Sequence, residues 1–292
     1  MWPSFHVKIP GKWVLAGEHS VLRGAQAVAL PHPDFSLELS FQPQVWSQPW
    51  AQEEEFLKIV PESAAPLIVD ILKTIREQTP SRGSGGFPWP RGSLLMESTI
   101  PVGAGLGSSA ALCVALTRWV SGPLGLAEHE LFDFARKLED RFHGRSSGMD
   151  VAAASMGQPI AFTMQGGGRA LKVTQLPRFT FHDTGLRSRT NDCVARVNAF
   201  RDSAPAAGDR WDRQMGEASE LSIAGLEAFQ RSPEEGLPLL TKAMGLARAC
   251  FEQWGLVPPE VRALEERLLA QGALAVKLTG AGGGGFVVAL WR

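Results

Sequence analysis

A run of glycines that leads into an apolar segment places the strongest constraint on how this chain can fold. Residues 101–116 read PVGAGLGSSAALCVAL, with glycines at alternating positions before two serines. Glycine permits positive φ angles and a close approach of the backbone to another group. The residues from 108 to 120 are predicted to be helical, and a loop entering a helix leaves free backbone N–H groups at the positive end of the helix dipole. Such a loop is suited to hold an anion, and phosphate is the expected one.

The common phosphate-binding loops do not fit this stretch. No lysine in a GKS or GKT context follows the glycines, which excludes a Walker loop. Gly103 and Gly105 match the start of a dinucleotide-binding motif, but Ser108 stands where its third glycine is required. A tight strand–helix connection is the structural alternative, although the loop is long and glycine-rich for that purpose. The sequence favours a phosphate site in which the hydroxyls of Ser108 and Ser109 contact phosphate oxygens or Mg²⁺.

A second glycine-rich stretch lies near the end of the chain, where residues 277–286 read KLTGAGGGGF. Five glycines in the six positions 280–285 cannot form a good strand or helix. A tight hairpin would need only two or three of them. We therefore expect another group to approach this backbone very closely, between two predicted strands.

Two further stretches carry ionisable residues. In PGKWVLAGEHSVLRG (residues 10–24), Lys12 precedes a short apolar strand, and Glu18 and His19 follow in a turn. In EDRFHGRSSGMDVAAASMG, Glu139 lies on a predicted helix and Asp150 precedes another apolar run. Each has an ordinary structural explanation when taken alone. Lys12 would lie at the end of a strand with its ammonium in water, and Asp150 would be a helix N-cap. Glu18, His19 and Glu139 would be solvated surface groups. No HExxH-type spacing indicates zinc.

Composition limits the class of protein. The 292 residues are 44% hydrophobic and 20% charged, which is typical of a soluble packed protein. A net charge of −1 argues against nucleic acid or a membrane as the main partner. Three widely spaced cysteines predict free thiols, and no apolar signal or spanning segment is present, so we expect a cytoplasmic protein.

The residue patterns predict an α+β protein that is strand-rich before about residue 175 and helix-rich after it. Helices are expected at 64–78, 127–144 and most of 209–271, and strands at 35–41, 93–101, 159–165, 170–176 and 178–185. Residues 42–55 and 80–92 are expected to be loops.

Three of these stretches, in this order, resemble the signature motifs of the GHMP small-molecule kinases: PGKWVLAGEHSVLRG, PVGAGLGSSAAL and KLTGAGGGGF. The resemblance covers essentially the whole chain. Within the family it is closest to the mevalonate kinases, because GEHSVLRG lacks the Asp and Asn of galactokinases and keeps the Glu-His pair that phosphomevalonate kinases usually lose. EDRFHGRSSGMD is similar to the mevalonate kinase pattern E-x-x-x-H-G-x-P-S-G-x-D, with Ser146 in place of the usual proline.

The resemblance implies a two-domain GHMP kinase fold with the active site in the cleft between the domains. Residues 1–175 would form a ribosomal protein S5 domain 2-like ATP-binding domain, and residues 176–292 a ferredoxin-like domain. The implied activity is ATP- and Mg²⁺-dependent phosphorylation of the hydroxyl of mevalonate, for isoprenoid synthesis, by a monomer or homodimer. Phosphomevalonate, homoserine or a sugar is the alternative acceptor, and a catalytically silent ligand-binding relative is the alternative class. Lys12, Ser109, Glu139 and Asp150 are all kept, which argues against a silent relative.

The resemblance also implies residue roles. Asp150 and Lys12 would form the catalytic couple, and Ser109 and Glu139 would be the Mg²⁺ ligands. Glu18, His19 and Thr190 would lie at the substrate pocket. The residues expected around ATP are Gly103, Ala104, Gly105, Leu106, Gly107, Ser108 and Ser109, with Gly280, Ala281 and Gly282 from the third motif. The implied chemistry requires that Lys12 and Asp150 meet beside Ser109.

Overall fold

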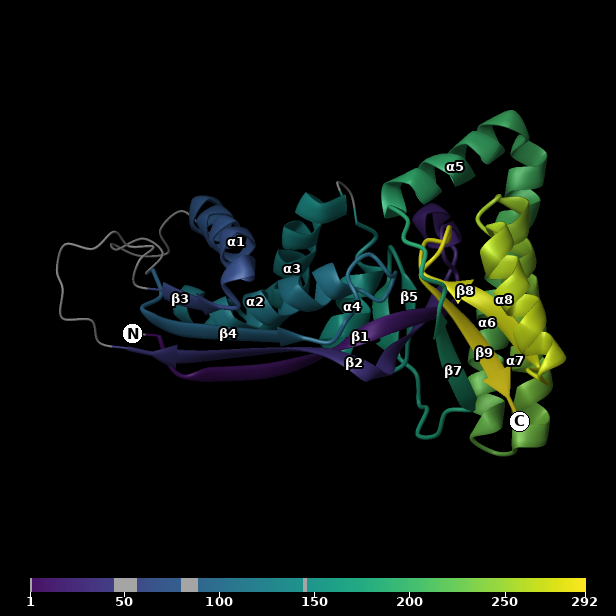
Figure 1. Ribbon diagram of the computed structural model, residues 1–292, viewed down its shortest axis with the longest axis horizontal. Coiled ribbons are helices and arrows are strands. Elements are labelled where there is room, and N and C mark those ends of the chain that lie inside the picture. The colour runs from purple at the N-terminus through teal and green to yellow at the C-terminus, as the bar shows by residue number, and fades with distance from the viewer. Residues whose placement is uncertain (1, 45–56, 80–88, 144–145) are drawn as a thin grey trace.

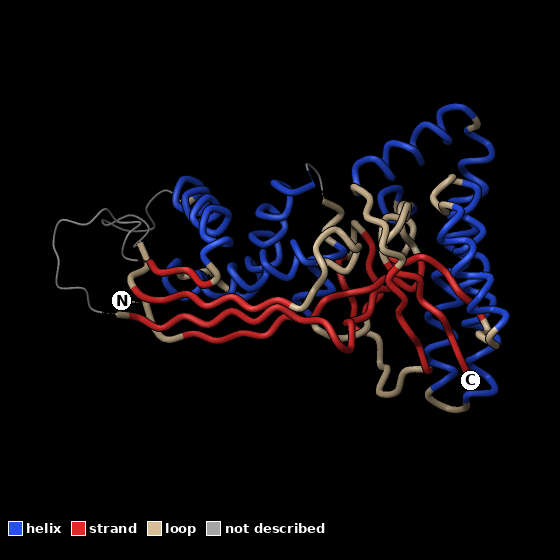
Figure 2. Tube along the Cα trace, in the orientation of Figure 1, coloured by secondary structure: helices blue, strands red, loops and turns tan. Residues whose placement is uncertain are grey.

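The computed structural model of the chain describes residues 2–44, 57–79, 89–143 and 146–292. Its described strands form two sheets, one of six strands and one of three, with helices on both (Figures 1 and 2). The expected α+β class is confirmed. The loops expected at 42–55 and 80–92 fall largely outside the described residues. No helix in the described ranges combines the length and apolarity needed to cross a bilayer.

The larger sheet is built around one long strand, β2, which pairs antiparallel with β1 along one edge and with β4 and β5 along the other. The strand order is β3-β4-β2-β5-β6, with β1 on β2. The strands are β1 (Phe5–Ala16), β2 (Ala27–Pro43), β3 (Leu57–Val60), β4 (Gly92–Ser98), β5 (Ile160–Thr163) and β6 (Gly167–Ala170). A short 3-10 helix, η1 (Ser20–Arg23), connects β1 to β2.

Helices cover one side of this sheet (Figure 1). They are α1 (Ala65–Gln78), α2 (Ser108–Leu124), α3 (Glu128–His143) and α4 (Met149–Met156). Helix α2 is buried along most of its length, because it packs against the sheet and against α3 and α4. That placement explains its almost uninterrupted apolar sequence, since a helix with partners on all sides has no polar face. The position of α2 fixes where the glycine loop before it lies.

The smaller sheet has the order β7-β9-β8 and is antiparallel throughout. Its strands are β7 (Arg178–Asp183), β8 (Ala275–Thr279) and β9 (Phe286–Trp291), and the later helices are α5 (Thr190–Ser203), α6 (Pro205–Phe229), α7 (Pro233–Gln253) and α8 (Pro259–Ala270). Alternate residues of β9 face different cores: Val288 joins the core of the large sheet, and Val287 joins the core of the later helices. Burial on both faces explains the unbroken apolar run of β9.

Two expectations need correction. Residues 170–176 do not form a strand, since β6 ends at Ala170 and pairs in a hairpin with β5. The apolar residues there lie in a loop, where Leu171 is buried and Val173 packs partly buried against the core of the large sheet. Helix α5 was not expected, because only Cys193 and Val197 are buried along it and the amphipathic signal is weak. The segment between β6 and β7, which contains the boundary expected near residue 175, leads from one sheet to the other.

Candidate active site

The two glycine-rich loops pack directly against each other. Gly103, Gly105 and Gly107 have φ angles of 73°, 77° and 76°, a region that glycine enters readily. A Cβ added to Gly280 would lie 3.0 Å from the Cα of Gly105, and one on Gly285 would lie 2.6 Å from the carbonyl oxygen of Ala104. The first glycine loop is therefore the group that approaches Gly280 and Gly285, and a side chain at either position would force the loops apart. The three glycines between them are approached by Leu256, Ser188 and Leu186.

Strand β1 holds the first loop in place through Lys12. The strand has a register shift between Pro10 and Lys12, and the backbone N–H of Lys12 donates to the carbonyl of Leu106 at 2.9 Å. The Lys12 ammonium donates to the carbonyl of Gly105 at 3.0 Å. A Cβ on Gly107 would lie 2.9 Å from the Lys12 side chain, so this glycine leaves room for it. The register shift in β1 thus directs the Lys12 side chain along the first glycine loop.

Lys12 forms an ion pair with Asp150. Its Nζ lies 2.9 Å from Oδ2 of the aspartate, and the two side chains are 4% and 29% exposed. Asp150 stands in the first turn of α4, after Gly148 at the N-cap, so it is not itself the cap. The ordinary explanations of these two residues are wrong, because the Lys12 side chain does not reach water and Asp150 is not the N-cap of α4. The partial exposure of Asp150 leaves its carboxylate open to a reactant.

Glu139 is almost completely buried near the end of α3, at 1% exposure, which excludes a solvated role. The hydroxyl of Ser146 donates to its Oε2 at 2.5 Å. Burial raises the pKa of Glu139 to about 7, and the negative charge of Asp150 adds to the effect. A buried carboxylate next to a second one is costly unless a cation accompanies them.

A second lysine–carboxylate pair, missed from the sequence, lies deeper. Lys277 of β8 donates to Oε1 of Glu18 at 2.6 Å and to the carbonyl of Val14 at 3.2 Å, and its ammonium lies 5.3 Å from the centre of the Phe251 ring. Oε2 of Glu18 is buried and has no partner among the described residues. Burial raises the pKa of Glu18, and Lys277 opposes this. A lysine inside the apolar strand AVKLT was the signal that sequence analysis passed over.

His19 adopts an unusual backbone conformation, with φ of 60° and ψ of −48°. It is the one non-glycine residue with positive φ in the described ranges. Its Nε2 lies 2.8 Å from the carbonyl of Ala281, and a carbonyl only accepts, so Nε2 carries the proton. Burial lowers the pKa of His19 to about 4, and the ring is therefore neutral at pH 7.

All the residues that the sequence placed in the site line one cavity of about 390 Å³. These are Lys12, Glu18, His19, Gly103, Ala104, Gly105, Leu106, Gly107, Ser108, Ser109, Glu139, Asp150, Thr190, Gly280, Ala281 and Gly282. Sequence analysis did not assign Ser147, Ser188, Asn191 or Thr279, which also line it. Segments far apart in the chain therefore meet around a single space.

The donor set fits magnesium. In the described part of the chain no three His, Cys, Asp or Glu residues form a metal cluster. Magnesium does not require one, since it keeps several waters and commonly takes one or two carboxylates together with phosphate oxygens. Glu139 and Ser109 offer a carboxylate and a hydroxyl at the same cavity. The raised pKa of Glu139 marks a place where added positive charge is favourable.

Comparison with known proteins identifies the family to which these motifs belong. The model of the GHMP kinases N terminal domain matches residues 66–158, and the GHMP kinases C terminal model matches residues 226–291. A mevalonate kinase of Aeropyrum pernix is 30% identical over an alignment of 295 positions, gaps included, which covers 97% of this chain and 87% of the relative.

Solved structures support the fold. The structure of L. major mevalonate kinase in complex with R-mevalonate superposes with a TM-score of 0.73 at 22% identity, covering 98% of this chain and 86% of that one. A Streptococcus pneumoniae phosphomevalonate kinase gives 0.71 at 17% identity, covering 99% and 92%. The fold alone therefore does not separate acceptors. Because both family models match in order and the 30% identical relative aligns over nearly the whole chain, this protein belongs to the GHMP kinase family of ATP-using phosphotransferases.

Proposed function

We propose that this protein transfers the γ-phosphoryl group of ATP to the hydroxyl of mevalonate. The observation that carries the proposal is the Lys12–Asp150 ion pair, which lies at the cavity beside the first glycine loop. The curated relatives named mevalonate kinase support mevalonate as the acceptor. The backbone N–H groups of the loop and of the α2 N-terminus are suited to the phosphates of the nucleotide.

Asp150 orients the acceptor hydroxyl for attack on the γ-phosphorus. As the new O–P bond forms and the bond from the γ-phosphorus to the bridging oxygen of ADP breaks, the hydroxyl proton passes to the Asp150 carboxylate. Phosphoryl transfer through a loose transition state asks for little activation of the nucleophile, so correct placement is the main requirement. Lys12, held by Asp150 and the carbonyl of Gly105, stabilises negative charge on the group in transfer.

Ser109 and Glu139 are the residues that would hold Mg²⁺. When bound, the ion neutralises charge on the β- and γ-phosphate oxygens. The hydrogen bond from Ser146 fixes one oxygen of Glu139 and thereby the direction of the carboxylate. Glu18, His19 and Thr190 also line the cavity, and we place the acceptor beside them, in a part of the cavity called here the acceptor end. A neutral His19 there offers hydrogen bonds without a fixed charge.

A coupled ADP-release assay with ATP and Mg²⁺ tests the proposal. Mevalonate, phosphomevalonate, homoserine and galactose are supplied in parallel, and a reaction without acceptor measures background hydrolysis. We expect release to rise far above background with mevalonate. If ADP release rises only with one of the other acceptors, the protein phosphorylates that acceptor instead of mevalonate. If ADP release stays at the background rate with all four acceptors, the protein is a catalytically silent relative.

A further inference from the structure

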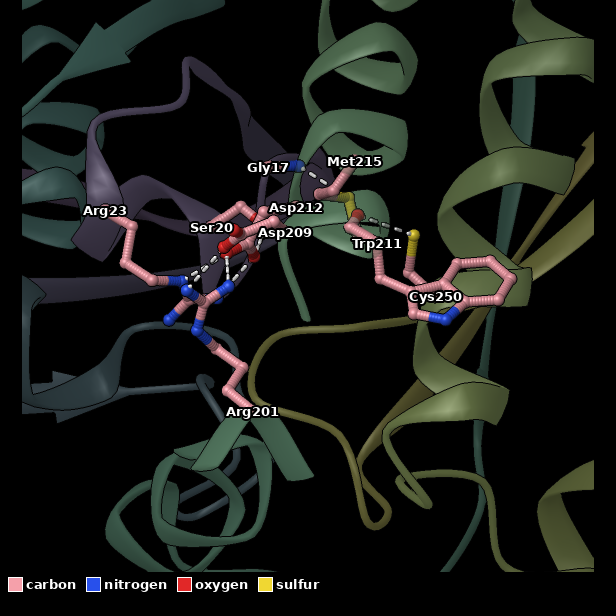
Figure 3. A network of polar contacts seen from close by, with 9 residues as sticks. All are labelled: Gly17, Ser20, Arg23, Arg201, Asp209, Trp211, Asp212, Met215 and Cys250. Atoms are coloured by element: carbon pink, nitrogen blue, oxygen red, sulfur yellow. Dashed lines mark hydrogen bonds and ion pairs between the residues drawn. The ribbon is translucent and has the colours of Figure 1, made fainter. Parts of the chain in front are cut away.

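The turn that carries Glu18 and His19 is held by a helix from the later part of the chain. The N–H of Gly17 donates to Sδ of Met215 at 3.2 Å. The hydroxyl of Ser20 donates to Oδ1 of Asp212 at 2.7 Å. Arg23 donates through Nε and Nη2 to the same carboxylate, both at 2.6 Å. Met215 and Asp212 lie three residues apart on α6, so one face of this helix holds both ends of the turn (Figure 3).

The same carboxylate also holds helix α5. Arg201, near the end of α5, donates to Asp212 and, at 3.0 Å, to Oδ1 of Asp209 (Figure 3). Thr190, at the start of α5, lines the cavity. Asp212 therefore joins two walls of the acceptor end, the turn with His19 and the helix with Thr190.

The turn needs such support because of its backbone. His19 has a positive φ, a conformation that a residue with a side chain keeps only when its surroundings impose it. Its ring is fixed from one side by the carbonyl of Ala281. The two arginines and Ser20 give Asp212 four donors, and its side chain is 15% exposed. Bonds to a charged, partly buried group are stronger than neutral ones.

We propose that Asp212 is a positioning residue for the acceptor: it sets the distance between the 17–23 turn and α5, and so the shape of the acceptor end. This inference rests on the proposed function for the identity of the acceptor. Among the described residues Asp212 does not line the cavity, and it acts through Ser20, Arg23 and Arg201.

Asp209 provides a matched control. It lies one turn earlier on α6 and pairs with the same Arg201, but its side chain is 59% exposed. Among the described residues it makes no hydrogen bond or ion pair with the 17–23 turn. In Asp212→Asn, Arg23 loses its carboxylate partner while Arg201 keeps Asp209. In Asp209→Asn, the contacts of Arg23 and Ser20 with Asp212 remain.

The kinetic test compares these two variants in the ADP-release assay. For Asp212→Asn we expect the KM for mevalonate to rise about tenfold, while kcat and the KM for ATP stay within about twofold. Asp209→Asn should leave all three constants within about twofold, and Asp212→Glu, which keeps the charge, should recover part of the loss. The proposal would be overturned if the two Asn variants had the same kinetic constants. It would also be overturned if Asp212→Asn lowered kcat and raised both KM values by similar factors.

A second measurement does not depend on turnover. Hydrogen exchange of the free protein should be faster in residues 17–23 of Asp212→Asn, and unchanged in residues 103–107, while Asp209→Asn exchanges like the wild type. Uniform acceleration over the chain would indicate general destabilisation and contradict a positioning role. If the wild type phosphorylates no acceptor, the proposed function fails, and the exchange data still decide whether Asp212 holds the turn.

Discussion

Two lysine–carboxylate pairs contribute to the cavity, and their surroundings differ. Lys12 and Asp150 both line it, whereas only Glu18 of the Lys277–Glu18 pair does. Lys12 and Asp150 are 2.9 Å apart, and the aspartate is 29% exposed. Lys277 and Glu18 are 2.6 Å apart, and both side chains are exposed by 3% or less. The first pair is open to a reactant on its carboxylate side. The second is closed, with its lysine also bound to the carbonyl of Val14.

This difference shows that the same two chemical groups can serve different purposes. A partly exposed pair can exchange its internal contact for contact with a substrate at low cost. A buried pair cannot do so, because removing either charge leaves the other without compensation in a dry environment. We therefore expect changes in the Lys12–Asp150 pair to affect turnover and changes in the Lys277–Glu18 pair to affect stability.

The largest effect is expected at the open pair. Asp150→Asn should lower kcat by about 10³-fold, since both orientation of the hydroxyl and acceptance of its proton are lost. Affinity for ATP should stay nearly intact. ADP release gives the turnover and nucleotide titration gives the affinity, with Glu38→Gln at an exposed surface ion pair as the control. Retained turnover in Asp150→Asn would remove this residue from the mechanism.

The closed pair should respond in stability. Lys277→Met leaves the Glu18 carboxylate buried without its partner, which is expected to lower the free energy of unfolding by about 3–5 kcal/mol. The double variant Lys277→Met/Glu18→Gln should recover much of this loss, because no lone charge remains. Urea denaturation measures both. Equal losses for Lys277→Met and Lys12→Met would show that burial does not distinguish the two pairs.

Acid should destabilise the region around the closed pair through His19. Its pKa is lowered by burial from 6.5 to about 4, so between these values the unfolded chain binds a proton that the folded chain does not. Stability from this group is therefore present above pH 6.5 and is lost as the pH falls, by about 2 kcal/mol between pH 7 and pH 5. The raised pKa values of Glu18 and Glu139 act in the opposite sense.

The contribution of His19 to this pH dependence is measured by comparing the wild type with His19→Gln. Urea denaturation of wild type and His19→Gln at both pH values should show a smaller acid loss in the variant. The same acid loss in both proteins would mean that the imidazole is protonated in the folded state as readily as in the unfolded one.

The smallest effect is expected beside the open pair, at Ser146. Ser146→Ala removes the hydrogen bond to Glu139, an interaction of about 1 kcal/mol, so half-maximal activity should require about fivefold more Mg²⁺. Glu139→Gln should shift the Mg²⁺ titration further, and Ser147→Ala, which loses only a bond from the N–H of Met149, should not shift it. Identical titrations in all three variants would argue against Glu139 as a ligand.

Much of the site could be predicted from residue patterns. The alternating glycines, the later glycine run and the Lys, Glu, His and Asp residues at fixed spacing all line the cavity. These residues could be recognised because backbone freedom at glycine and side-chain chemistry are properties of short consecutive stretches of sequence. Lys277 and Asp212 were missed because each is ordinary in its own stretch, and each contacts the 17–23 turn from more than 180 positions away in the chain.

The sequence by itself determined the α+β class, the position of the glycine loops and the kind of chemistry they support. Tertiary structure alone decided that the two loops pack against each other, that Lys277 pairs with Glu18, and that α6 holds the turn with His19. The physical reason is that local patterns fix the conformational freedom and polarity of a segment. The choice of partner for a charge depends on how sheets and helices from distant segments come together, and on how much water that packing excludes.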